Sequence, residues 1–92
     1  MPDGSASRFA FVPAAMPAEA AAFYVGMGEH AFLARVAAGK APQPIRDGRQ
    51  VIWLRADLDL YLAVLAGTRP AVDWLDGRAA WRQAAGEQAT GW

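Results

Sequence analysis

Arginines flank a two-residue turn signal in the middle of this chain, and they are its residues best suited to a chemical role. Asp47-Gly48 is a strong hairpin signal, because both residue types readily take the positive φ angles of a type I′ turn. Arg46 precedes the pair and Arg49 follows it. A hairpin that ends in this turn presents guanidinium groups at its tip, where they can donate hydrogen bonds to phosphate oxygens.

The basic residues gather around this turn although the whole chain is neutral. Nine Lys and Arg balance nine Asp and Glu over 92 residues, which argues against a nucleic-acid binder that depends on overall positive charge. From Glu29 to Arg55, however, five basic residues stand against two acidic ones. The five are Arg35, Lys40, Arg46, Arg49 and Arg55. This local excess predicts a basic patch on a neutral protein.

Side chains that could catalyse a reaction are scarce. The serines and Thr68 have no histidine and acid arranged to activate them. Asp57 and Asp59 form a carboxylate pair, but two residues apart on a helix they face different directions, and Asp57 better suits the positive end of a helix dipole. Gly26-x-Gly28 lacks the preceding strand and third glycine of a phosphate-binding loop. We therefore predict that the protein is not an enzyme.

Metal, cofactor and membrane sites are not indicated either. The chain has no cysteine, which excludes thiolate ligands and disulfides. His30 is the only histidine, and a lone histidine near a helix start is usually a surface residue; its alternative role is a base or phosphate contact. No signal peptide or long apolar run is visible. We expect no metal, no cofactor, no membrane contact and, by default, a cytoplasmic location.

Proline and glycine positions predict the elements that must position these residues. Pro17 suits the first turn of a helix, and Gly39 is a helix stop. We predict helices over 18–24, 29–38, from Arg55 to a stop at Gly67, and from Pro70 to about Ala85. The hairpin strands are predicted at Ile45–Arg46 and Arg49–Trp53, with Trp53 in the core. Phe9–Val12 is either a further short strand or a hydrophobic lead-in. Leu58, Tyr61, Leu62 and Leu65 share one face of the third helix.

The order of these motifs resembles the phage AlpA/excisionase-like family of small winged helix-turn-helix DNA-binding proteins. The resemblance covers a helix, a glycine turn, a helix that ends in Gly-x-x-Pro, a basic hairpin with tryptophan, and Asp-Leu-x-x-Tyr-Leu. The matching residues are Ala21-Ala22, Gly26, Phe32-Leu33, Val36, Gly39, Pro42, Pro44, Gly48-Arg49, Val51, Trp53, Arg55, Asp57-Leu58 and Tyr61-Leu62.

The resemblance implies a mostly α winged helix-turn-helix fold with a two-stranded β-hairpin wing and an additional C-terminal helix. Residues 1–15 are then a flexible lead-in, 16–67 the winged helix-turn-helix domain, and 68–92 a C-terminal helical extension and tail. The implied function is non-catalytic duplex DNA binding, as an excisionase, recombination directionality factor or transcriptional regulator. The expected DNA-binding residues are His30, Ala31, Ala34, Arg35, Lys40, Arg46, Arg49 and Arg55.

The second helix departs from the family pattern at the positions that read DNA. The family usually has Ser or Thr where Gly28 and Ala31 stand, and a basic residue where Ala34 stands. With Phe32, Leu33 and Val36 toward the core, the opposite face is Ala31, Ala34 and Ala38. Three readings of this alanine face remain open. It fits DNA by shape while arginines bind phosphates, or it is covered by the Trp74/Trp81 helix of the same chain or of a neighbour, or it is simply solvated.

The tryptophans of the C-terminal segment are the other unusual feature. Trp74, Arg78 and Trp81 align at i, i+4 and i+7 of the predicted fourth helix, with Leu75 beside them. Either this helix caps the core, or it joins subunits or binds another protein through Trp74, Leu75 and Trp81. If the segment joins subunits or binds another protein, the alternative function is a phage-like assembly or protein-interaction module, such as a genome-packaging subunit. Such a module keeps the helix-turn-helix fold but does not read bases.

Overall fold

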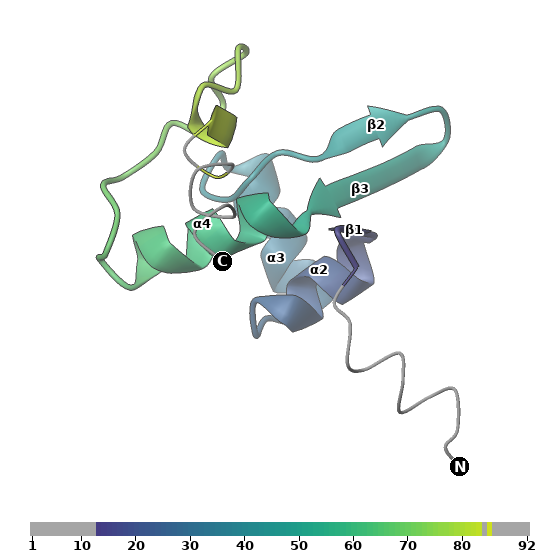
Figure 1. Cartoon of the computed structure of the whole chain (residues 1–92). Helices are drawn as coiled ribbons and strands as arrows, with labels where there is room; N and C mark the ends of the chain where they lie inside the picture. The colour runs from purple at the N-terminus through teal and green to yellow at the C-terminus, as the bar shows by residue number, and fades with distance from the viewer. Residues whose placement is uncertain (1–12, 84, 86–92) are drawn as a thin grey trace.

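The structure is a computed structural model that describes residues 13–83 and residue 85 of the chain. Within these residues the elements are, in order, β1 (Ala15–Met16), α2 (Ala18–Tyr24), α3 (Glu29–Ala37), β2 (Ile45–Asp47), β3 (Gln50–Leu54) and α4 (Arg55–Leu65). A short helical turn follows at residues 81–83 and 85. The strands form a three-stranded antiparallel sheet, and the β2–β3 hairpin projects from the helices (Figure 1).

Each helix ends where a glycine follows it. At the end of α3, Gly39 has a φ of +75°. Its N–H donates to the Val36 carbonyl at 3.1 Å, and the Lys40 N–H donates to the Arg35 carbonyl at 2.8 Å. This is a Schellman motif, which needs a residue that tolerates positive φ. The predicted helices at 18–24 and 29–38 are confirmed, the second to within one residue, and the third is confirmed as α4.

The hairpin is confirmed, but its turn differs from the predicted one. Asp47 pairs with Gln50, so the two-residue loop is Gly48-Arg49. Gly48 has a φ of +61°, whereas neither Asp47 nor Arg49 has a positive φ. Positive φ at the first loop position alone is the pattern of a type II′ turn. The predicted type I′ turn at Asp47-Gly48 is therefore wrong by one residue of register.

An additional strand, which the sequence did not predict, completes the sheet. Ala15 pairs with Leu54 and Met16 with Trp53, so β3 is the central strand. Two residues between prolines give no periodic signal, and only the neighbouring strand identifies them as β structure. The predicted strand at Phe9–Val12 lies outside the described residues.

The core lies between the inner face of the sheet and the helices. Trp53 is buried as predicted; its ring meets Phe32 edge-on with centroids 5.3 Å apart, and its Nε1 donates to the Pro42 carbonyl at 2.8 Å. On α4, Leu58 and Tyr61 are buried. Leu62 and Leu65 are exposed and Leu60 is buried instead, so the predicted apolar face of this helix is only half right.

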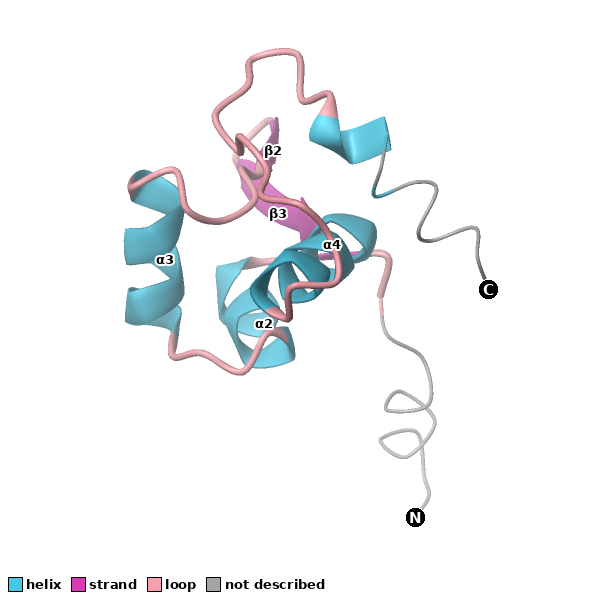
Figure 2. Ribbon diagram, turned by 90° about the vertical axis from the view of Figure 1, so that its left-hand side faces the viewer, coloured by secondary structure: helices cyan, strands magenta, loops and turns pink. Residues whose placement is uncertain are grey.

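The C-terminal segment does not form the predicted helix. Residues 70–80 form turns and irregular structure, and Figure 2 shows one long loop between α4 and the short helical turn. The Asp73 carboxylate accepts a hydrogen bond from the Leu75 N–H, and the Asp76 carboxylate accepts from the Arg78 and Ala80 N–H groups. Such bonds compete with helical ones. Ala79, with a φ of +50°, is also incompatible with a helix.

Candidate nucleic-acid interface

The two arginines of the hairpin are exposed, and one of them faces α3. Arg46 pairs with Val51, so its side chain lies on the same sheet face as Val51 and Trp53, whereas Asp47 lies on the opposite face. Arg46 also lines a cleft together with residues of α3. Arg49 stands in the loop at the tip. The hairpin is therefore basic toward α3 and acidic on its other face.

The alanine face of α3 is exposed in the described structure. Ala31, Ala34 and Ala38 are all exposed, as are His30 and Arg35 beside them. Trp74 and Trp81 pack elsewhere, so the idea that they cover this face within the same chain is wrong. Leu33, predicted to face the core, is 38% exposed because it lies on the flank of α3 that faces the hairpin.

Three of the predicted contacts on and beside α3 lie away from the hairpin. Leu33 and Ala37, one turn apart, line the cleft beside the hairpin. Ala31 and Arg35, also one turn apart, therefore lie on the flank away from the hairpin. Lys40 is exposed just beyond the C-terminal end of the helix. Arg35 and Lys40 thus extend the basic surface around α3 without joining the hairpin arginines.

Arg55 lies apart from the other predicted DNA contacts. It opens α4 at the opposite end of β3 from the tip, about 17 Å away at roughly 3.3 Å per strand residue. Near it, the Tyr24 hydroxyl donates to the Asp59 carboxylate. Burial and this hydrogen bond raise the pKa of Tyr24 to about 12, while the charge of Arg55 opposes the shift. Arg55 therefore belongs to the electrostatics of α2 and α4.

An apolar cleft of about 290 Å³ lies between α3 and the hairpin, and we call it the α3–hairpin cleft. Its lining residues are Leu33, Val36, Ala37, Gln43, Pro44, Arg46, Val51, Trp53 and Leu75. Leu75, 62% exposed, comes from the long loop and packs against Gly39. The sequence analysis missed this cleft, because the predicted helix at 70–85 gave no reason to place Leu75 beside α3.

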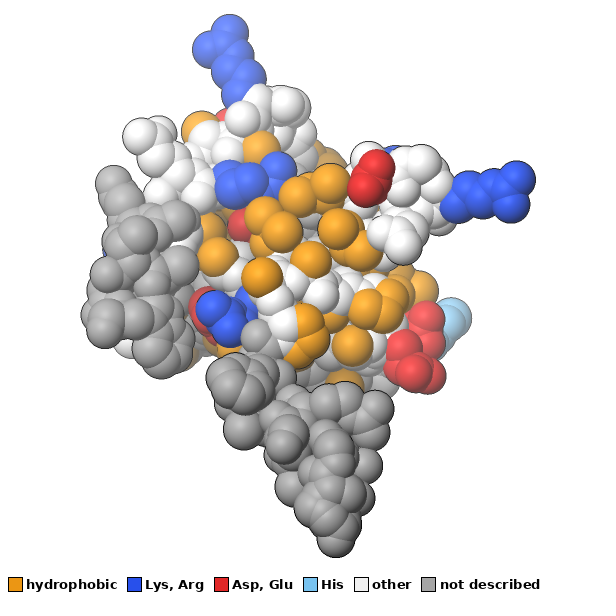
Figure 3. Space-filling view, turned by 45° about the vertical axis from the view of Figure 1, so that its right-hand side comes forward, with side chains coloured by type: hydrophobic (Ala, Val, Ile, Leu, Met, Phe, Trp, Pro, Cys, Tyr) orange, Lys and Arg blue, Asp and Glu red, His pale blue; other side chains and the backbone are white. Residues whose placement is uncertain are grey.

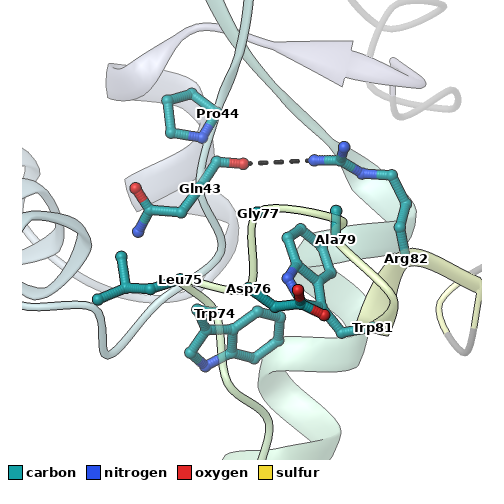
Figure 4. Close-up of a pocket in the computed structure, with 9 residues that line it drawn as sticks. All are labelled: Gln43, Pro44, Trp74, Leu75, Asp76, Gly77, Ala79, Trp81 and Arg82. Atoms are coloured by element: carbon teal, nitrogen blue, oxygen red, sulfur yellow. Dashed lines mark hydrogen bonds between the residues drawn. The ribbon is translucent and has the colours of Figure 1, made fainter.

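A second cleft, of about 320 Å³, separates the loop from the start of the hairpin (Figure 4). Arg82 on its wall binds Oδ2 of the buried Asp57 at 3.1 Å, makes a 3.5 Å hydrogen bond to the Gln43 carbonyl, and lies over the Trp81 ring. Burial raises the pKa of Asp57, and the Arg82 guanidinium opposes the shift. These contacts hold the C-terminal segment on α4.

The predicted protein interface is mostly part of the core. Trp74 and Trp81 are 4% and 7% exposed, their ring centroids lie 5.0 Å apart, and Trp74 packs against Tyr61. The reading in which this segment caps the core is therefore confirmed for both tryptophans. Only Leu75 of the predicted interface remains exposed.

Metal sites and membrane-spanning helices were also sought in the part of the chain that the structure describes. Residues 13–83 and 85 hold no group of three or more His, Cys, Asp or Glu side chains that could bind a metal ion. Across the same residues, every helix is too short or too polar to cross a membrane. The basic hairpin, the exposed face of α3 and the cleft between them are thus the surfaces to interpret. Neither the models of known protein families nor the curated proteins contain a match to this chain.

Proposed function

We propose that this protein binds duplex DNA without catalysis, in the manner of a winged helix-turn-helix protein with the β2–β3 hairpin as its wing. One observation carries the proposal: Arg46 lies on the α3-facing side of a hairpin whose strand β3 contacts α3 through Trp53. The contact between Trp53 and Phe32, with ring centroids 5.3 Å apart, holds hairpin and helix together. A helix in the major groove and a hairpin on the adjacent backbone require such a fixed relation.

The charged contacts then come mainly from the hairpin. Arg46 and Arg49 donate hydrogen bonds to phosphate oxygens, and Arg35 and Lys40 extend the contact around α3. Such contacts are independent of base sequence and depend strongly on salt. Arg55 is left out of this surface because it stands at the far end of β3.

Base readout by α3 is weak in this proposal. Ala31 and Ala34 cannot hydrogen-bond base edges, although their methyl groups can contact thymine methyls. His30 is the polar side chain at the start of the exposed face. Binding that depends on shape and phosphates suits an excisionase or recombination directionality factor, which bends DNA in the cytoplasm, better than a regulator with a strict target sequence.

A titration of a labelled mixed-sequence duplex at low and moderate salt tests the proposal. We expect binding at low salt that weakens as the salt concentration rises. The Arg46→Ala, Arg49→Ala double variant should bind all sequences more weakly and reduce the slope of log affinity against log salt by about two. Arg78→Ala, which removes an exposed arginine of the long loop, is the matched control and should keep the wild-type slope. Absence of binding at low salt rejects the proposal.

A further inference from the structure

Phe23 is the most exposed large apolar side chain among the described residues. It stands on α2 and is 85% exposed, while Ala21, Ala22 and Val25 carry the core side of that helix. One exposed apolar residue is ordinary on a protein surface. What distinguishes Phe23 is that the same chain offers an unfilled apolar cleft on other elements.

The α3–hairpin cleft suits an aromatic side chain. Leu33 and Leu75 on its walls are 38% and 62% exposed, so apolar surface on both sides remains in contact with water. The cleft encloses about 290 Å³. An aromatic side chain buries roughly 150–250 Å² when it is covered, which makes it the usual anchor of a protein interface. Exposed apolar side chains also occur outside this cleft, since Figure 3 shows them spread over one broad face of the molecule with charged side chains around them.

The charges beside the two surfaces are opposite. Glu19 is exposed and precedes Phe23 by one helical turn, so both side chains lie on the same face of α2. Arg46 is exposed and forms part of the cleft. Because Arg46 lines the same cleft as Leu33 and Leu75, a helix that docks with its ring in the cleft can place its carboxylate against this arginine. Charge complementarity of this kind fixes the orientation of a docked partner.

We propose that Phe23 of one copy of this protein docks into the α3–hairpin cleft of a second copy, with Glu19 against Arg46. The docking and receiving surfaces lie on different elements, with α2 on the lower side of the molecule and the hairpin on its upper right (Figure 1). The contact is therefore heterologous, and it repeats from copy to copy as a ring or an open chain. This assembly needs no DNA and does not use the buried tryptophans.

Sedimentation equilibrium of the full chain without DNA tests the proposal. We expect a mass that rises with concentration. Phe23→Asp and Leu33→Asp should each weaken association by about 30-fold or more, as expected for loss of an interface anchor. Leu65→Asp, at a residue 52% exposed on α4 and outside both surfaces, is the matched control and should associate like wild type. Circular dichroism verifies that each variant is folded.

A mixture of the two impaired variants gives the sharper result. The Phe23→Asp protein keeps an intact cleft, and the Leu33→Asp protein keeps Phe23, so the mixture should form one-to-one dimers and nothing larger. Glu19→Arg and Arg46→Glu should each weaken association, and combining both changes in one chain should restore part of it. A wild-type protein that stays monomeric, or a mixture that stays monomeric, overturns the proposal.

The Phe23→Asp variant separates this assembly from DNA binding. Phe23 and Glu19 lie outside the proposed DNA surface, so Phe23→Asp should bind duplex with wild-type affinity at concentrations where both proteins are monomers. A chain that associates but does not bind DNA would reject only the proposed function. A chain that binds DNA but never associates would reject only the head-to-tail contact.

Discussion

Asp57 is 1% exposed on α4, and only one of its two carboxylate oxygens has a hydrogen-bond partner among the described residues. Its position near the start of a helix predicted only a favourable interaction with the helix dipole. The structure instead places it beneath Arg82, 25 residues later in the chain. No local pattern can predict such a pair, because the loop between the partners determines whether they meet.

The stability of the protein should depend on pH through Asp57. Burial raises its pKa above the ordinary value of 3.8, so the folded chain holds this proton more tightly than the unfolded chain does. The protonated Asp57 carboxyl contributes its full stabilisation when pH is below the pKa that this group has in the unfolded chain. That contribution is lost as pH rises through the higher pKa of the folded chain. Relative to wild type, Asp57→Asn should therefore gain stability as pH rises above 3.8, the ordinary pKa of an aspartate, because asparagine does not titrate. Urea unfolding followed by tryptophan fluorescence measures this, and Asp47→Asn should keep the wild-type profile.

Gly39 should tolerate a side chain less well than Gly67 does. Both have a φ near +80°, at +75° and +80°, and alanine at either costs about 1–2 kcal/mol for that conformation. At Gly39 an added methyl would also lie 2.6 Å from Leu75 Cδ1, whereas nothing lies within 4 Å at Gly67. Gly39→Ala should therefore lower the free energy of unfolding more than Gly67→Ala. Equal losses in chemical denaturation would contradict the packing of Leu75 on α3.

At the scale of elements, prediction succeeded where the signals are local. Pro17 starts α2, Gly39 ends α3, and Asp47-Gly48 places the hairpin to within one residue. The β1 strand and the long loop were not predictable in this way, because Ala15–Met16 needs β3 as its partner and the carboxylates of the loop outcompete helical hydrogen bonds. The same limit applies to the candidate site: the exposed arginines of the hairpin were predicted, but the cleft was not.

Substitutions in the hairpin turn distinguish the observed type II′ turn from the type I′ turn that the sequence predicted. In the observed turn only Gly48 has a positive φ, so Gly48→Ala should cost about 1–2 kcal/mol. Asp47 is an extended residue paired with Gln50, so Asp47→Thr should be neutral or slightly stabilising, because threonine favours strands. Thermal unfolding compares the two variants. A large loss from Asp47→Thr would instead support the type I′ turn.

At the scale of the whole molecule, the C-terminal segment is part of the same core as the helices and the sheet. Trp74, Trp81 and Ala85 are buried in one cluster with Trp53 and Tyr61. The segment therefore cannot be treated as an appendage to residues 16–67, and it also supplies Leu75 to the cleft.

The edge-to-face packing of Phe32 on Trp53 has a mechanical consequence. Because Trp53 is also tied to the Pro42 carbonyl, the hairpin and α3 are joined through a buried ring that cannot shift without breaking a hydrogen bond. These two contacts fix the base of the hairpin against α3. If the protein binds duplex DNA as proposed, such a fixed pairing with few base-reading side chains would respond to groove width and curvature, so its preferred sites would share a shape while differing in sequence.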